Sequence, residues 1–156
     1  FVSNTDGSGQ ISLDGSDGTS RFYVHASDLP YMSFGDKGYN QRAYLGLTSE
    51  GAGLLRMRDS SGKEIVSIEG QSQPFLRLSE AGTERAYLGV NTGNDSELLF
   101  SHPGGAKNMV LEGGSAPFLS MYDTSGTDRV DMGFYSSGAQ GIQFNNAYGT
   151  LIWGSP

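Results

Sequence analysis

The 156-residue sequence contains no cysteine, which excludes disulfide bonds and thiol chemistry. Charged residues make up only 17% of the chain, and its ten lysines and arginines are scattered without a basic stripe. We therefore expect no nucleic-acid partner. No apolar run is long enough to cross a membrane, and we expect neither a signal peptide nor membrane insertion. No stretch places apolar residues at i, i+3, i+4 and i+7, so the sequence predicts essentially no helix.

Recognisable catalytic and metal-binding motifs are also missing. There is no Ser-His-Asp set, Walker motif or glycine-rich phosphate loop. His25 and His102 have no second histidine or carboxylate at metal-ligand spacing. The turn at residues 14–18, DGSDG, lacks the full ligand set of a calcium loop, and aspartate and glycine are what a tight turn needs. We therefore expect no metal, no cofactor and no catalytic residue.

What the chain does contain is an internal repeat. Pro30, Pro74 and Pro117 begin similar segments at offsets of 44 and 43 residues. The segment RAYLGL at 42–47 returns as RAYLGV at 85–90 and, more loosely, as RVDMGF at 129–134. We expect one repeat-built domain over residues 1–156, with a partial repeat (1–29), two full repeats (30–73 and 74–116) and an atypical C-terminal capping repeat (117–156). Because the chain begins inside a truncated repeat, we expect a fragment or a processed product.

Each repeat halves again into two short segments in which apolar residues alternate with others. Such alternation places the apolar residues on one face of a β-strand. From the last apolar residue of one such pair of segments to the first of the next the offset is 8, as from Leu47 to Leu55. This even offset keeps every apolar pair in the same pleat phase. The sequence thus predicts an all-β meander of about fourteen short antiparallel strands. Representative pairs are Leu45/Leu47, Leu55/Met57, Leu88/Val90, Ile142/Phe144 and Leu151/Trp153.

Turn signals separate the strands. The hairpin tips end in glycine, and an aspartate three residues before that glycine is typical of a type I turn closed by a left-handed glycine. Examples are the tips at 59–62, DSSG, and 123–126, DTSG. In the tip at 35–38, GDKG, the same pattern assigns the closing position to Gly38.

The predicted sheet has one apolar face and no helix to cover it. An open sheet of this length must curl, close or pack its apolar face on something else. Self-association is the simplest cover, with three copies facing inward around a shared axis or two face to face. We expect an elongated homotrimer.

The segment LRLSEAGTERAYLGV at 76–90 resembles the repeats of trimeric bacteriophage tail fibres and related bacterial surface fibres, including phage hyaluronidase-type fibres. The resemblance extends over most of the chain and implies a trimeric β-prism or triple-stranded β-helix. It also implies an extracellular or virion location and a role as a shaft or receptor-binding segment in host attachment.

Two other architectures are compatible with the pattern. A period of 43 to 44 residues with four strands fits a β-propeller blade, although three and a half periods do not close a ring. A β-solenoid with about 22 residues per turn is the third option, but tips of the Asp-x-x-Gly type favour antiparallel pairing over it.

Candidate binding residues lie where the repeat pattern breaks, near the C-terminus: Asn145, Asn146, Tyr148 and Trp153. Aromatic rings beside amides suit sugar rings, which need an apolar platform and directional polar partners. Alternatively, Trp153 continues the inward pair Leu151/Trp153 and closes the end of the array. Tyr44 and Tyr87 occupy equivalent outer positions, where they either form an exposed ladder or shield the strand backbone.

We therefore expect a structural fibre segment that recognises a cell-surface glycan. A passive fibre without a ligand is the first alternative. The second is a polysaccharide lyase of the hyaluronan-cleaving kind, in which Tyr122, Asp123, Asp128, Arg129 and Gln143 supply proton transfer and charge neutralisation. Asp123 and Arg129, however, stand at repeat positions that Asp59 and Arg85 fill elsewhere, which favours a turn role for them.

Overall fold

The computed structural model describes residues 2–3, 7–134 and 138–155, which contain fifteen β-strands and no helix. The chain divides into two compact units, unit 1 (Phe1–Leu76) and unit 2 (Arg77–Pro156). The strands are β1 (Val2–Ser3), β2 (Gly9–Asp14), β3 (Ser20–Ala26), β4 (Tyr31–Gly35), β5 (Gln41–Leu47), β6 (Gly53–Arg58), β7 (Glu64–Glu69), β8 (Phe75–Glu80), β9 (Thr83–Val90), β10 (Ser96–Ser101), β11 (Lys107–Gly113), β12 (Phe118–Tyr122), β13 (Asp128–Phe134), β14 (Gln140–Asn145) and β15 (Leu151–Ser155).

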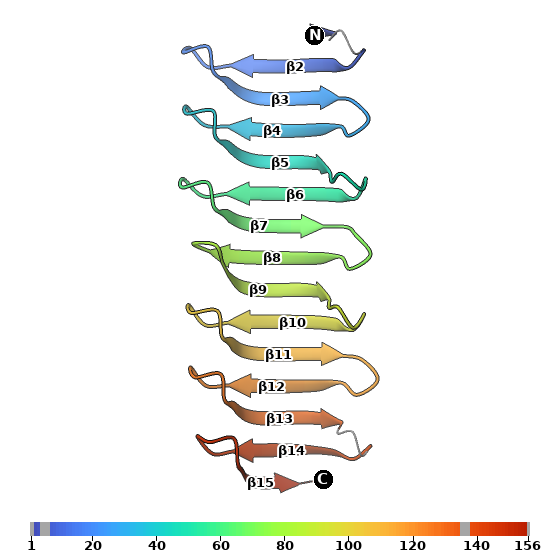
Figure 1. Cartoon of the computed structure of the whole chain (residues 1–156), viewed down its shortest axis with the longest axis vertical. Helices are drawn as coiled ribbons and strands as arrows, with labels where there is room; N and C mark the ends of the chain where they lie inside the picture. Colours follow the sequence, from blue (N-terminus) through green and yellow to red (C-terminus); the bar gives the residue numbers. More distant parts are fainter. Residues whose placement is uncertain (1, 4–6, 135–137, 156) are drawn as a thin grey trace. The chain divides into compact units, whose positions relative to one another are not determined.

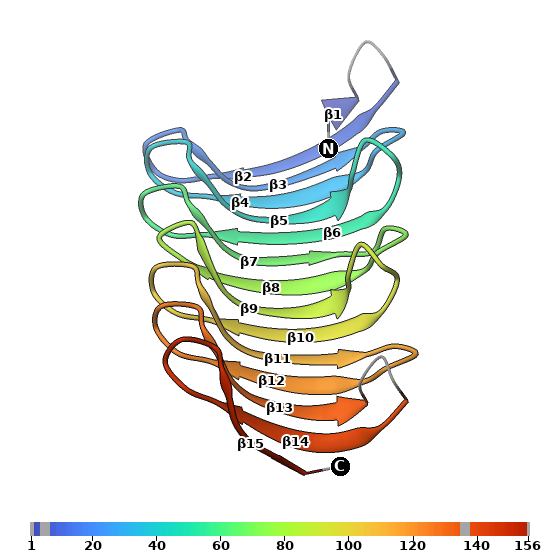
Figure 2. The ribbon, with the colours of Figure 1, turned by 60° about the horizontal axis from the view of Figure 1, so that its bottom comes forward.

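Within each unit, every strand pairs with its neighbours in the sequence, and every pairing is antiparallel. Unit 1 contains the meander β1 to β7, and unit 2 contains the meander β9 to β15 (Figure 1). The division between the units falls inside β8. In both units the strands are bowed along their length (Figure 2). The predicted all-β antiparallel meander is confirmed.

The propeller and solenoid alternatives do not describe either unit. A propeller blade ends after four strands, whereas pairing in unit 1 continues without interruption from β1 to β7. A solenoid stacks its strands in parallel, but the described strand pairs are antiparallel in both units. In the described residues, no helix is long and apolar enough to cross a membrane.

The predicted apolar pairs face one another across the strands and form an apolar face on each unit. Cross-strand neighbours are Leu45 with Met32 and Leu55 in unit 1, and Leu111 with Leu98 and Leu119 in unit 2. Among the described residues of each unit, nothing covers its apolar face. Leu45 is 53% exposed and Leu111 is 48% exposed, values typical of the large apolar side chains on them.

The most buried side chains lie on the opposite, polar face. Val110 is only 1% exposed and stands between Leu99 and Ser120, while Ser67 stands opposite Arg56 and is almost inaccessible. Short side chains are thus buried beneath longer neighbours on the same face. Sequence patterning assigned the core to the apolar face, but in the single chain the best-covered residues are on the other side.

The last strand departs from its predicted register. A bulge between Phe144 and Asn145 sets Leu151 opposite Asn145 and leaves Trp153 opposite Phe144. Gly154 lies opposite Gln143, and Leu151 lies opposite Asn145. A Cβ added to Gly154 would be 3.5 Å from a Leu151 methyl carbon, so both positions are on the polar face. The predicted inward pair Leu151/Trp153 is therefore wrong: Trp153 is on the apolar face and Leu151 is not.

Several hairpin turns share one hydrogen-bonded pattern. In the turn after β6, the Asp59 carboxylate accepts backbone N–H groups from Ser61 (2.8 Å) and Lys63 (3.0 Å), and Gly62 has a positive φ of 86°. This confirms the predicted left-handed closing glycine. The turn after β4 is an exception, because its positive-φ residue is Tyr39 (62°), one position beyond the predicted Gly38.

Candidate functional site

Asn146, predicted as a binding residue, holds a turn together. Its side-chain oxygen accepts the backbone N–H groups of Tyr148 (2.9 Å) and Thr150 (3.0 Å). These are the bonds that Asp59 makes in its own turn, so the Asn146 amide oxygen is engaged by the backbone. The signal was available in the sequence, since Asn146 opens a four-residue tip that ends in Gly149.

The other three C-terminal candidates separate in space. Tyr148 lies at the tip of the turn and is 92% exposed. Trp153 is 53% exposed and tilts against Phe144 with ring centroids 5.4 Å apart, so it belongs to the apolar face. Asn145, at the end of β14, shares the polar face with Leu151. The predicted set is therefore divided between a turn and the two faces, and it does not converge on one pocket.

Tyr44 and Tyr87 fold back over the strand that carries them. The Tyr44 hydroxyl donates to the Leu47 carbonyl oxygen at 3.0 Å, and the Tyr87 hydroxyl donates to that of Val90 at 2.7 Å. A Cβ added to Gly46 would lie 2.7 Å from the Tyr44 hydroxyl oxygen, so the glycine makes room for this fold-back. The equivalence of the two tyrosines is confirmed, and both shield backbone.

In unit 1, Tyr44 also ends a row of rings on the polar face. Its ring stacks with Tyr31 at 5.4 Å, and Tyr31 stacks with Tyr23 at 5.6 Å. His25, in β3, packs against both Tyr23 and Tyr31. Burial raises the pKa of Tyr31, and the neighbouring tyrosines add to the shift. Such a row offers an apolar surface beside polar groups.

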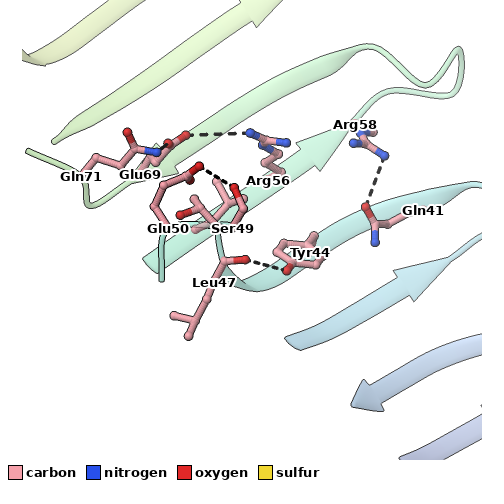
Figure 3. Close-up of a pocket in the computed structure, with 11 residues that line it drawn as sticks. Gln41, Tyr44, Leu47, Ser49, Glu50, Arg56, Arg58, Glu69 and Gln71 are labelled. Carbon is pink, nitrogen blue, oxygen red and sulfur yellow. Dashed lines mark hydrogen bonds and ion pairs between the residues drawn. The ribbon is translucent and has the colours of Figure 1, made fainter. Parts of the chain in front are cut away.

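The row leads into a cavity of about 390 Å³ on the polar face of unit 1 (Figure 3). Strands β5, β6 and β7 supply its walls, and the connector after β5 supplies one rim. Its lining combines one aromatic ring with arginines, carboxylates, amides and hydroxyls: Gln41, Tyr44, Leu47, Thr48, Ser49, Glu50, Leu54, Arg56, Arg58, Glu69 and Gln71. Groups of these types recognise a ligand with several hydroxyls and a charge.

The two arginines of this cavity differ in their partners. Arg56 lies between two carboxylates, with 3.2 Å from its Nε to Glu64 and 3.9 Å from Nη2 to Glu69. Arg58 instead donates to the amide oxygen of Gln41 at 3.3 Å (Figure 3). The guanidinium of Arg56 is thus neutralised within the chain, whereas that of Arg58 contacts a neutral group.

A second polar cluster occurs on unit 2. A bulge between Met121 and Tyr122 sets Asp128 opposite Tyr122, on the same face as Asp131, which accepts a hydrogen bond from Ser120. Burial raises the pKa of Asp128 to about 6, and the Asp131 carboxyl adds to this through a hydrogen bond and its charge. Burial also raises the pKa of Tyr122.

This cluster contains only part of the lyase set. Asp131, Tyr122 and Gln143 line a cavity of about 350 Å³. Arg129 instead pairs with Asp123 at 3.7 Å, and Asp123 accepts backbone N–H groups from Ser125 and Thr127 in its turn. The hairpin therefore separates the acid and base groups from the cation that would neutralise a uronate.

No metal site is evident in the parts of the chain that the structure describes, where no three His, Cys, Asp or Glu side chains converge suitably. In the turn after β2, the Asp17 carboxylate accepts from the Thr19 hydroxyl (2.6 Å) and pairs with Arg21 (2.7 Å). These contacts within the turn account for the aspartate-rich segment at 14–18.

No family model matches the chain, and no curated protein matches it significantly. The function must therefore be inferred from the geometry.

Proposed function

We propose that this chain is a segment of a self-associating fibre, a homotrimer of the β-prism or triple-stranded β-helix kind. Its role is host attachment in a viral tail fibre or a bacterial surface appendage, through a cell-surface glycan. The observation that carries the proposal is the apolar face of each unit, on which side chains such as Leu45 and Leu88 are 53% and 54% exposed.

Another copy of the chain is the partner that best fits these faces. Large contiguous apolar surfaces mark interaction sites. Both units carry an apolar face of similar composition. A partner that covers both faces therefore needs a repeated apolar surface of its own, and an identical chain has one. Three inward-facing copies would bury the apolar faces and leave the charged groups, which total −7 per chain, on the outside. We place the fibre outside the cell on the resemblance of its repeats to those of tail fibres.

Light scattering of the purified chain tests the assembly. We expect a particle near three times 16.6 kDa. Leu45→Glu and Leu88→Glu each place a charge on an apolar face and should give monomers, because a buried unpaired carboxylate is costly. Ala147→Glu, in an exposed turn, is the matched control and should leave the mass unchanged. A monomeric wild-type chain would refute the proposal.

Attachment is tested on a glycan array with the same preparation. Tyr148 is the candidate contact that self-association leaves exposed, since it lies at a turn and not on the apolar face. Tyr148→Ala should reduce glycan binding and leave the mass unchanged. A trimer that binds no glycan would instead be the passive fibre.

A polysaccharide lyase is the alternative activity, favoured by Tyr122 beside Asp128 and Asp131. Incubation with hyaluronan and other uronate polymers should then release unsaturated products that absorb in the ultraviolet. Asp131→Asn should abolish the signal. The absence of absorbing products across such a panel would eliminate this activity.

A further inference from the structure

The two arginines that line the cavity of unit 1 have no counterpart at the equivalent positions of unit 2. Arg56 lies opposite Tyr44, and Leu99 lies opposite the equivalent Tyr87 of unit 2. Arg58 occupies the bulged end of β6, and Ser101 occupies the same position in β10. The fold therefore forms with leucine and serine at these places, so neither arginine is required by the strand architecture.

Arg58 is also the exception among the arginines of the described residues. Each of the other six has a carboxylate within ion-pair distance: Arg21, Arg42, Arg56, Arg77, Arg85 and Arg129. Arg58 is half-buried, and its hydrogen bond goes to the Gln41 amide. A cation that is partly removed from water and has no anion of its own is suited to bind one from a ligand.

The other residues that line the cavity limit the class of ligand that can supply this anion. Glu50 and Glu69 lie on the same cavity, and the whole chain carries a net charge of −7. Nucleic acids, polyphosphates and densely sulfated polymers would be repelled. Ser49, Thr48 and Gln71 offer hydroxyl and amide groups instead, which suit a ligand rich in hydroxyls.

We propose that this cavity binds a sugar with a single negative charge, with Arg58 donating to its carboxylate. Gln41 orients the guanidinium, and the ring of Tyr44 forms the apolar wall. The proposal rests on the attachment role proposed above and names its ligand as an acidic sugar, such as a sialic or uronic acid residue. On the polar face of unit 1, it adds a second sugar site to the Tyr148 contact proposed above.

Calorimetric titration of the full chain tests this site. The probes are sialyllactose, a glucuronic-acid oligosaccharide, its carboxyl-reduced form, lactose and 6-sulfolactose. We expect binding of the two carboxylated sugars and none of lactose or the reduced form. Preference for 6-sulfolactose over both carboxylated sugars would overturn the carboxylate assignment. Arg58→Ser, which installs the residue found at the equivalent position of unit 2, should weaken binding at least about tenfold.

Arg85→Ser is the control, because Arg85 is paired with Glu80 at 3.6 Å in unit 2; it should bind like the wild type. Circular dichroism and light scattering show whether each variant keeps its fold and mass. If charged and neutral sugars bind equally, or Arg58→Ser binds normally, the acidic-sugar site is refuted. If the mass is trimeric and only neutral glycans bind, this site fails and the attachment proposal stands.

Discussion

Two turns of the chain contain the same pair of residue types in opposite order. The turn after β4 reads Gly38-Tyr39 and the turn after β14 reads Tyr148-Gly149. In both, the second residue has a positive φ, 62° at Tyr39 and 75° at Gly149. A left-handed conformation costs an L-residue roughly 1–2 kcal/mol, and glycine avoids that cost.

Tyr39→Gly should therefore stabilise the fold by about 1 kcal/mol, because it removes that steric cost at an exposed position. The reciprocal change, Gly149→Tyr, should destabilise it by a similar amount. Urea unfolding curves of both variants measure the effect. Destabilisation by Tyr39→Gly would show that the tyrosine ring makes a contact worth more than the strain.

Asp128 should make stability fall as pH rises. Burial, together with the hydrogen bond and charge of Asp131, raises the pKa of Asp128 from 3.8 to about 6 in the folded chain. The folded state thus binds this proton more tightly than the unfolded state does. The contribution of Asp128 to the free energy of unfolding is therefore fully present below pH 4. It is lost between pH 4 and pH 6 or slightly above. Tyr122 and Asp131, which face it, supply no cation.

The measurement is the thermal midpoint at pH 5 and pH 7 in the wild type and in Asp128→Asn. The asparagine cannot ionise, so the difference between the two proteins isolates this carboxyl from the histidines. The wild type should lose more stability than the variant between the two pH values. An equal change in both would mean that Asp128 does not hold its proton in the fold.

At the scale of the strand, alternation predicted most of the fold and failed where strands bulge. The prediction that the pairs Leu45/Leu47 and Leu55/Met57 share one face is confirmed, since Leu45 lies opposite Leu55. A slip of one residue would have turned the apolar set of one strand to the other face. A bulge inserts one residue and reverses the faces beyond it. That is why Leu151 is on the polar face although it stands two residues before Trp153.

The candidate site residues differ in the signal that the sequence carries for them. Tyr148 and Trp153 stand where the alternation of apolar pairs breaks down, so the pattern indicates them. Arg58 interrupts no apolar pair, so the alternation does not indicate it. Aligning the repeats by register would have identified it, since Ser101 stands at the equivalent position. Its lack of a carboxylate partner is a three-dimensional property that no sequence pattern contains.

Adjacent residues of β11 should respond differently to truncation. Val110 is buried on the polar face, whereas its neighbour Leu111 is 48% exposed on the apolar face. Val110→Ala should cost about 2 kcal/mol in any assembly state, because it leaves a cavity. Leu111→Ala should cost little in a monomer and should weaken self-association. Unfolding measured on the monomeric Leu45→Glu background separates the two effects, and equal losses there would contradict this assignment of faces.

At the scale of the whole molecule, the exposed apolar faces predict that folding and assembly are linked. When the native state is an oligomer and the unfolded state is a single chain, mass action makes the midpoint of unfolding depend on protein concentration. A chain whose apolar faces are covered only by other copies must show this dependence, since dilution uncovers side chains such as Leu45 and Leu88.

We therefore expect the thermal midpoint to rise with each tenfold increase in wild-type concentration. Leu45→Glu should have a lower midpoint that does not change with concentration, because its native state is already a monomer. Ala147→Glu should behave like the wild type. A wild-type midpoint that stays constant over a hundredfold range of concentration, while light scattering shows one chain per particle, would mean that the apolar faces remain in water. The fibre proposal would then lose its physical basis.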